Sequence, residues 1–311
     1  MPFATGGNAR IRTNISAENA YNALEASNRE ISLRQLRLST GKRINNASDD
    51  LAGYITSRAL SSRNGALKAA LNTVGDANNI TSIAMDALDN LSSLIIQIKD
   101  SVAQAASGAL GTDEKVALAK SAYRLAQQIQ TVVDSTVFGG KQLINGSYSA
   151  NFFIGISYSN TLITLSVDLT TSNPDLNVSN NNFDVNSTNN INFAGISNLN
   201  LQSLNDVSAT DLGIFADSMM STTLTSLANA LDNVTKVGAY LGGFATRLTS
   251  QEDLIKSQIV NYDTAISRLE DADVAQEQLN LIKAQFLQQA SLISLSQANQ
   301  NPNSYLQLIR G

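Results

Sequence analysis

The strongest constraint on the fold of this chain is a stretch of about 58 residues, Phe244 to Asn301, that contains neither glycine nor proline. Ala, Leu, Gln, Ile and Glu are frequent there, so we predict one long helix or two helices joined end to end. A continuous helix would be roughly 87 Å long at 1.5 Å per residue, which is more than a compact domain of this size requires.

The apolar residues of this stretch recur at steps of three, four and seven, as they do along one face of a helix. They are Leu248, Ile255, Ile259, Tyr262, Ile266 and Leu269, followed by Leu279, Ile282, Phe286, Ala290 and Ile293. A helix with such a stripe needs a partner, because its apolar face is not stable in water. We expect that partner to be the other end of the chain, and then further copies of the molecule.

The N-terminal part of the sequence predicts a second long helix. Its apolar positions repeat at intervals of seven, as in a coiled coil: Ala17, Leu24, Ile31 and Leu38. Ser16 is the expected N-cap of this helix and Gly41 its expected C-terminal cap.

Two further helices and a connector follow. The polar segment 39–53 is interpreted either as a plain connector or as a joint that bears on neighbouring subunits, with Ser48, Asp49 and Asp50 opening the next helix. A bundle helix is then predicted from an unbroken pattern of threes and fours: Ala70, Val74, Ala77, Thr81, Ala84, Leu88, Leu91, Ile95, Ile98, Val102 and Ala105. A third helix is expected from Thr112, as its cap, to about Ser135, with these residues inward: Val116, Ala119, Ala122, Leu125, Ile129 and Val132.

The middle of the sequence differs sharply in composition from both ends. Between Lys141 and Lys236 there are seven Asp but no Lys or Arg, and Asn, Ser and Thr are abundant. Residues 152–158 and 161–167 predict a β-hairpin around Ser159 and Asn160, and 171–200 an irregular surface. We interpret this region as a solvent-facing module. Helix is expected again from about Asp217, weakened by Gly238, Gly242 and Gly243.

The composition excludes most catalytic and binding chemistry. The chain has no Cys and no His, which removes thiol nucleophiles, imidazole bases and the usual zinc and copper ligands. A net charge of −5 argues against nucleic-acid binding, and no apolar run approaches a membrane-spanning length. The carboxylates of Glu270, Asp271 and Asp273 are spread around a helix, so we interpret them as a solvated or subunit-contacting face. We therefore expect no catalysis, no cofactor and no metal.

The organisation itself predicts the class of protein. Both ends carry striped helices, and the polar module lies between them in the sequence. The fold is expected to be mainly α, a long coiled coil or bundle formed by both termini, with a small central module that contains the β-hairpin. Such a molecule is a building block for assembly.

Several motifs, in order, resemble those of the bacterial flagellins. They are Thr13-Asn14-Ile15, the segment LSTGKRINNASDDLAG at 38–53, SRLEDAD at 267–273, KAQFLQQA at 283–290, QANQ at 297–300 and LQLIR at 306–310. The resemblance covers about 1–145 and 218–311. The central module matches no motif that we can name.

The resemblance implies a subunit that polymerises into the flagellar filament and serves swimming motility. It implies four parts: residues 1–40 and 275–311 as an inner coiled coil, 41–53 as a joint, 54–147 and 218–274 as a helical bundle, and 148–217 as the outer surface. It places subunit contacts in the terminal helices and the joint, at Leu24, Ile31, Leu38, Arg43, Asn45, Asp49, Asp50, Glu270, Asp273, Ile282, Phe286 and Ile293.

The resemblance also implies partners and a location. The chain would be secreted through the flagellar type III export apparatus with an export chaperone, which fits the lack of a signal peptide at its start. It would polymerise with itself beneath a cap protein and on hook–filament junction proteins, outside the cell. Vertebrate innate receptors contact many flagellins at an Arg and a Glu, and the positions aligned with these hold Gln97 and Lys120 here. We therefore expect weak activation of that receptor.

Three alternatives remain beside the filament subunit. A hook–filament junction protein shares the terminal helices, although the C-terminal match favours a flagellin. A surface adhesin or ligand-binding flagellin homologue would use the Asn-rich central module. A flagellin with a metallopeptidase insert would need His ligands, which this chain lacks.

Overall fold

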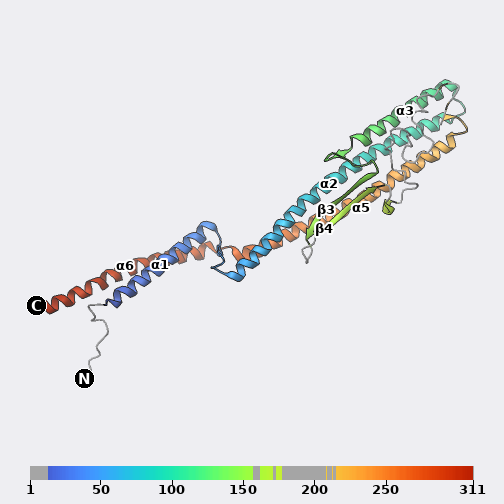
Figure 1. Ribbon diagram of the computed structural model, residues 1–311. Coiled ribbons are helices and arrows are strands. Elements are labelled where there is room, and N and C mark those ends of the chain that lie inside the picture. The colour runs from blue at the N-terminus through green and yellow to red at the C-terminus, as the bar shows by residue number, and fades with distance from the viewer. Residues whose placement is uncertain are drawn as a thin grey trace. The chain divides into compact units, whose positions relative to one another are not determined.

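The computed structural model describes residues 13–156, 162–170, 173–176, 208, 212 and 215–310, with side chains up to residue 300. The chain divides into two compact units, which we call the terminal unit (1–64 and 260–311) and the middle unit (65–259). The helices are α1 (Ile15–Thr40), α2 (Leu51–Ala105), α3 (Thr112–Ser135), α5 (Met220–Glu270) and α6 (Val274–Arg310) (Figure 1). The predicted mainly α fold is confirmed.

The N-cap of helix α1 is not the residue that the sequence predicted. The side chain of Asn14 accepts a hydrogen bond from the backbone N–H of Ala17 at 3.2 Å, so Asn14 is the N-cap and the prediction of Ser16 was wrong. Asn and Ser cap helices about equally well, so sequence alone did not separate them. At the other end Gly41 adopts the left-handed conformation with φ 70°, as predicted for a C-terminal cap.

Helix α2 is capped by the last of the three residues expected to open it. The carboxylate of Asp50 accepts a hydrogen bond from the N–H of Gly53 at 2.9 Å, which is the contact that an N-cap makes. Asp49 instead accepts from the N–H groups of Asn45 and Asn46, at 2.9 and 3.0 Å, and so closes the preceding loop. Of the three residues expected to open this helix, Asp50 is therefore the cap, and Ser48 and Asp49 precede it.

The stripe predicted along α2 forms the core of the middle unit. Every one of its positions is buried, which confirms the pattern read from the sequence: Ala70, Val74, Ala77, Thr81, Ala84, Leu88, Leu91, Ile95, Ile98, Val102 and Ala105. Helix α3 is correct in extent, but Gly111 precedes it without a side-chain cap. Its inward face is slightly rotated from the predicted one. Ala119, Ala122 and Ile129 are buried as expected, whereas Ala126 and Val133 are buried in place of Leu125 and Val132, which are half-buried.

A β-hairpin of the middle unit packs on α5. Strands β3 (Ser147–Ile156) and β4 (Leu162–Thr170) pair antiparallel, from Ser147 opposite Thr170 to Ile156 opposite Leu162. The inner face buries Tyr148, Phe152, Leu165, Val167 and Leu169. The hydroxyl of Tyr240 on α5 accepts a hydrogen bond from the N–H of Asp168 at 3.4 Å. The predicted hairpin is confirmed, while its turn at Ser159–Asn160 and most of the irregular segment 171–200 lie outside the described residues.

A smaller hairpin joins α3 to this sheet. Strands β1 (Val137–Phe138) and β2 (Lys141–Gln142) pair across Gly139 and Gly140, with φ values of 57° and 80°. Positive φ at both central residues is the requirement of a tight hairpin turn of this type, and glycine adopts it without strain. A single 3-10 turn, η1 (Pro174–Leu176), follows β4.

The long glycine-free stretch forms two helices, the second of the two expected possibilities. Helix α5 ends at Glu270 and α6 starts at Val274. Helix α5 also runs unbroken through Gly238, Gly242 and Gly243, where weakening was expected. Buried apolar side chains on both sides of the glycines, including Val234, Val237, Leu241 and Phe244, hold this part of the helix, and tertiary packing outweighs the low helix propensity of glycine.

Candidate functional site

The two ends of the chain pair within the terminal unit. Helices α1 and α6 lie side by side and antiparallel (Figure 1), since Asn14 contacts Ala298, Asn28 contacts Gln288 and Arg34 contacts Glu277. The predicted stripe of α1 faces α6, and its members are half-buried: Ala17, Leu24, Ile31 and Leu38. Ser27 is the buried residue of α1, so this helix is only partly covered in a single chain.

Helix α6 turns the less apolar of its two faces toward α1. The buried residues of α6, Glu277, Ala284 and Ala298, lie on the side that contacts α1. The predicted apolar stripe lies on the opposite side: Leu279, Ile282, Phe286 and Ile293 are 63%, 41%, 66% and 72% exposed, and Ala290 is exposed as well. The expectation that this stripe is covered first by the other end of the chain was therefore wrong.

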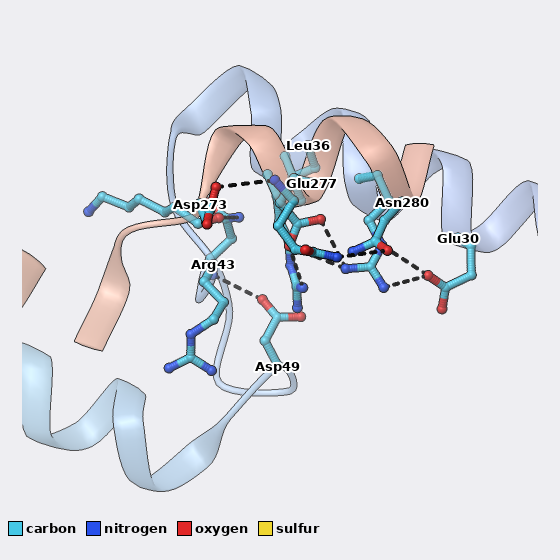
Figure 2. A network of polar contacts seen from close by, with 12 residues as sticks. Glu30, Leu36, Arg43, Asp49, Asp273, Glu277 and Asn280 are labelled. Carbon is cyan, nitrogen blue, oxygen red and sulfur yellow. Dashed lines mark hydrogen bonds and ion pairs between the residues drawn. The ribbon is translucent and has the colours of Figure 1, made fainter. Parts of the chain in front are cut away.

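A charged cluster explains which face of α6 meets α1. The carboxylate of Glu277 lies 2.9 Å from a guanidinium nitrogen of Arg34 and 3.2 Å from one of Arg37 (Figure 2). Arg34 also binds Glu30 at 2.8 Å on its own helix. Burial alone would lower the pKa of Arg34, but its hydrogen bonds with Glu277 and Glu30 outweigh burial and raise the pKa. Pairing these charges requires Glu277 to face α1, which turns Phe286 outward.

The α1–α6 pair is loosely packed beside this cluster. A groove of about 280 Å³, open to solvent, lies between the helices and is lined by Ser27 and Arg34 of α1 and by Ala284 and Leu287 of α6, among others. Protein interiors are normally close-packed. The pair is therefore an incomplete core, with open space on one side and a bare apolar stripe on the other.

The predicted joint residues are brought together at the base of this pair. The backbone N–H of Arg43 donates to the carbonyl of Glu270 at 2.6 Å, and its guanidinium donates to the carbonyl of Leu269 at 2.8 Å. A cation at the C-terminus of a helix is favourable for the helix dipole, so Arg43 caps α5. A second backbone hydrogen bond links the two connectors, 41–50 between α1 and α2 and 271–273 between α5 and α6. The N–H of Ala272 donates to the carbonyl of Gly41 at 2.9 Å.

Charged side chains reinforce the joint. Lys42 Nζ lies 2.7 Å from the buried carboxylate of Glu270, and this hydrogen bond, followed by one from Ser57, lowers the pKa of Glu270. Backbone hydrogen bonds from Asn46 and Asn45 lower the pKa of Asp49.

The remaining joint residues have local roles. Asn45 donates to the carbonyl of Lys42 at 3.0 Å, and Asp273 caps α6 by accepting from the N–H groups of Ala275 and Gln276. Asp50 caps α2 as described above and lies 3.9 Å from Arg43.

Sequence reasoning missed the residues that hold the site together. Glu277, Arg34 and Arg37 were not among the candidates, although one signal was available: two cations three residues apart on one helix and a single Glu at an inward position of the other. Ile44, 3% exposed in the joint, was also missed. The receptor positions Gln97 and Lys120 are exposed on α2 and α3 of the middle unit.

The site offers surface for assembly. No helix in the described part of the chain has a segment long and apolar enough to cross a membrane. Among the same residues, no cluster of His, Cys, Asp or Glu is suited to hold a metal. A bare apolar stripe on a terminal helix, beside a half-covered partner helix, is typical of a subunit that completes its core with other copies. The fold and the site thus define a self-assembling structural protein.

Comparison with known proteins agrees. A model of the bacterial flagellin N-terminal helical region matches residues 11–149, and one of the bacterial flagellin C-terminal helical region matches residues 224–309. A flagellin of Bacillus subtilis is 29% identical over 97% of this chain and 100% of its own length. Polar flagellin C of Vibrio parahaemolyticus is 26% identical over 96% of this chain and 99% of its own length.

Other matches are partial. Flagellin A of Vibrio cholerae is 32% identical over 49% of this chain, and the match spans 41% of that protein. The solved structure of a Vibrio parahaemolyticus protein described as flagellar hook-associated has a TM-score of 0.56 at 14% identity, with 72% of this chain and 100% of that chain covered. This last likeness is one of fold alone.

The two family models together match well over half of the chain, which belongs to the bacterial flagellin family. Proteins of this family are structural subunits that assemble into the extracellular flagellar filament, the propeller of swimming bacteria. The protein is thus a filament subunit and not an enzyme, as the resemblance of its terminal motifs implied. Its central region, between the two matched regions, is covered by neither family model.

Proposed function

We propose that the apolar stripe of α6, formed by Leu279, Ile282, Phe286, Ala290 and Ile293, is a contact surface between neighbouring subunits of the filament. The observation that carries the proposal is the exposure of this stripe in the single chain, with Ile293 at 72% and Phe286 at 66%. Complete burial of one such large side chain is worth about 1.5–3 kcal/mol. Several of them on one helix face provide a driving force that the isolated chain does not use.

The terminal helices and the joint then divide the work of assembly. Residues 1–40 and 275–311 form the inner coiled coil, in which Leu24, Ile31 and Leu38 hold α1 against α6 and use their remaining exposed surface on neighbours. The joint, 41–53, orients this part through its polar residues Arg43, Asn45, Asp49 and Asp50, together with Glu270 and Asp273 between α5 and α6. Residues 54–147 and 218–274 form the bundle, and 148–217 face outward. The half-buried state of α1 and the bonds across the joint support this division.

The family relationship also supports a set of partners. The subunit binds an export chaperone, leaves the cell through the flagellar type III export apparatus, and polymerises beneath a cap protein onto hook–filament junction proteins. These assignments rest on family membership, since the chain offers terminal helices of the kind that such proteins share.

The proposed surface is tested by Ile293→Asp. A carboxylate at this position remains solvated in the free chain, because the side chain is exposed, so the free energy of unfolding should change by no more than ~0.5 kcal/mol. Within a filament the same carboxylate would be desolvated among apolar neighbours, which costs several kcal/mol. We expect seeded polymerisation, measured by sedimentation and electron microscopy, to fail.

Gln285→Asp is the matched control, because it adds the same charge to the same helix but lies about 100° around the helix from Phe286. We expect filaments of this variant to grow. Growth of Ile293→Asp at the rate of the parent chain would refute the proposed contact surface.

We also propose that this flagellin activates vertebrate innate receptors weakly, because Gln97 and Lys120 stand where many flagellins carry an Arg and a Glu. Both side chains are exposed, so their charge and shape are presented directly to a partner. The double variant Gln97→Arg with Lys120→Glu should raise activation in a receptor reporter assay. Potency of the parent chain equal to that of an enteric flagellin would contradict the proposal.

A further inference from the structure

We infer that Glu277, held between Arg34 and Arg37, fixes the register in which the two ends of the chain pair. This inference goes beyond filament assembly, since it concerns which turns of α1 lie against which turns of α6. Glu277 is 7% exposed, and it joins the helices through hydrogen bonds of 2.9 and 3.2 Å to Arg34 and 3.2 Å to Arg37. It is the buried carboxylate of the α1–α6 contact.

The apolar contacts of the pair leave the register open. The stripe of α1 repeats at intervals of seven, so displacing one helix by a heptad brings an equivalent apolar residue to each position. The facing side of α6 repeats less strictly: Ala284, Ser291 and Ala298 are one heptad apart, and Gln288 lies midway between Leu281 and Leu295. A displaced pair therefore buries a similar apolar surface, with Gln288 in the place of one leucine.

The charged cluster distinguishes these registers. If α6 were displaced by one heptad so that Ala284 lay opposite Arg34 and Arg37, these two half-buried cations would lose the carboxylate of Glu277 as their partner. An uncompensated buried charge is strongly unfavourable, more so than the net gain of a well-formed buried pair. The Nε of Arg37 is buried without a hydrogen-bond partner among the described residues, so the cluster itself carries a desolvation cost. Such a cluster contributes more to specificity than to stability.

Two weaker polar contacts agree with the same register. Gln288 donates to the side-chain oxygen of Asn28 at 2.6 Å, and Asn14 donates to the carbonyl of Ala298 at 2.8 Å. The first is exposed, where water competes for both groups. The backbone bond between Gly41 and Ala272 restrains the base of the pair, and the test below separates its effect from that of Glu277.

Introduced cysteines can report the register without background, because the natural chain has none. Asn28→Cys with Gln288→Cys reports the observed register, and Asn28→Cys with Leu281→Cys or with Leu295→Cys reports a displacement of one heptad. Each double variant is treated with a short bismaleimide cross-linker, both as free chain and in seeded filaments. Intramolecular products are then quantified by peptide mass spectrometry.

With Glu277 present, we expect the 28–288 product to dominate. Glu277→Leu should lower the ratio of this product to the displaced products by roughly tenfold or more, because the charge no longer penalises displacement. An unchanged ratio would overturn the inference, since the connectors would then set the register alone. Absence of the 28–288 product from both preparations would overturn it as well.

Two variants control for loss of folding. Glu25→Leu removes the carboxylate of an exposed pair with Arg29 on the outer side of α1, and it should leave the ratio unchanged. Reversing the whole cluster, with Glu277→Arg, Arg34→Glu, Arg37→Glu and Glu30→Arg together, should restore the parent ratio, because Glu30 also pairs with Arg34. Recovery by reversed charges is a result that a general packing role of Glu277 does not produce.

Discussion

At the scale of single residues, Gly53 shows how closely the joint is packed. A Cβ atom at this position would lie 2.6 Å from Cδ1 of Ile44 and 2.6 Å from a carboxylate oxygen of Asp50. Ile44 is 3% exposed and has little room to move, while Asp50 caps the helix to which Gly53 belongs. Gly53 has an ordinary helical conformation, which any residue can adopt. Glycine is therefore required here by lack of space for a side chain and not by its backbone conformation.

We expect Gly53→Ala to destabilise the terminal unit by about 1–3 kcal/mol, the usual cost of overpacking, although alanine is the better helix former. Urea unfolding followed by circular dichroism measures the change. Gly65→Ala is the control, because a Cβ there meets no atom within 4 Å and should stabilise α2 by about 0.5–1 kcal/mol. Equal effects of the two substitutions would contradict the steric explanation.

At the scale of elements, two carboxylates of the joint region have lowered pKa values, one bonded across to Lys42 and one closing its own loop. Hydrogen bonds from Lys42 and Ser57 lower the pKa of Glu270, and backbone N–H groups of Asn46 and Asn45 lower that of Asp49. A lowered pKa in the folded state means that the stabilisation is fully present above the unfolded value, about 4, and is lost as the pH falls through the folded value.

We therefore expect the joint to loosen as the pH falls below about 4, while it is insensitive to pH between about 5 and 8 in a chain without histidine. Hydrogen exchange of residues 41–53 at graded pH, corrected for the intrinsic exchange rate at each pH, measures this. Glu270→Gln should raise exchange at neutral pH and reduce the further rise on acidification. Exchange in the parent chain that stays constant down to pH 2 would contradict the prediction.

The elements also show how one helix serves two partners. Helix α6 turns Glu277, Ala284 and Ala298 toward α1 and leaves Ile282, Phe286 and Ile293 exposed. Helix α2 of the middle unit does not divide its contacts in this way, because its predicted apolar stripe is buried along its whole length. The difference between the two units is thus the difference between a completed core and one that awaits further subunits.

At the scale of the whole molecule, the two units should differ in stability. Among the residues of α1, Ser27 is the buried one, and a solvent-open groove of about 280 Å³ lies against the same helix. A helix with so little buried surface opens easily, because its apolar face supplies most of its stability.

We expect residues 15–38 to exchange rapidly in the free chain and slowly in the filament, where neighbouring subunits cover them. Residues 70–105 should be protected in both states. Hydrogen exchange with mass spectrometry on both preparations measures the difference. Strong protection of residues 15–38 in the free chain would show that the ends are stable without assembly.

The sequence alone determined those features that depend on local pattern. The stripe of α2, the C-terminal cap at Gly41, the hairpin and the family motifs were all read correctly, because periodicity, glycine geometry and strand composition act over a few residues. Helix starts were less well defined, since Asn14 and Ser16, or Ser48 and Asp50, are all good caps and neighbouring contacts choose between them.

Only the tertiary structure decided which face of α6 meets α1. The apolar stripe was the better candidate by hydrophobicity, but Arg34 and Arg37 on α1 draw Glu277 inward, and the rest of the helix follows because its side chains are fixed in rotation relative to one another. A pairing between residues more than two hundred positions apart has no local signature. The sequence thus identified the apolar stripes of the helices, and the fold determined which of them remains exposed in the single chain.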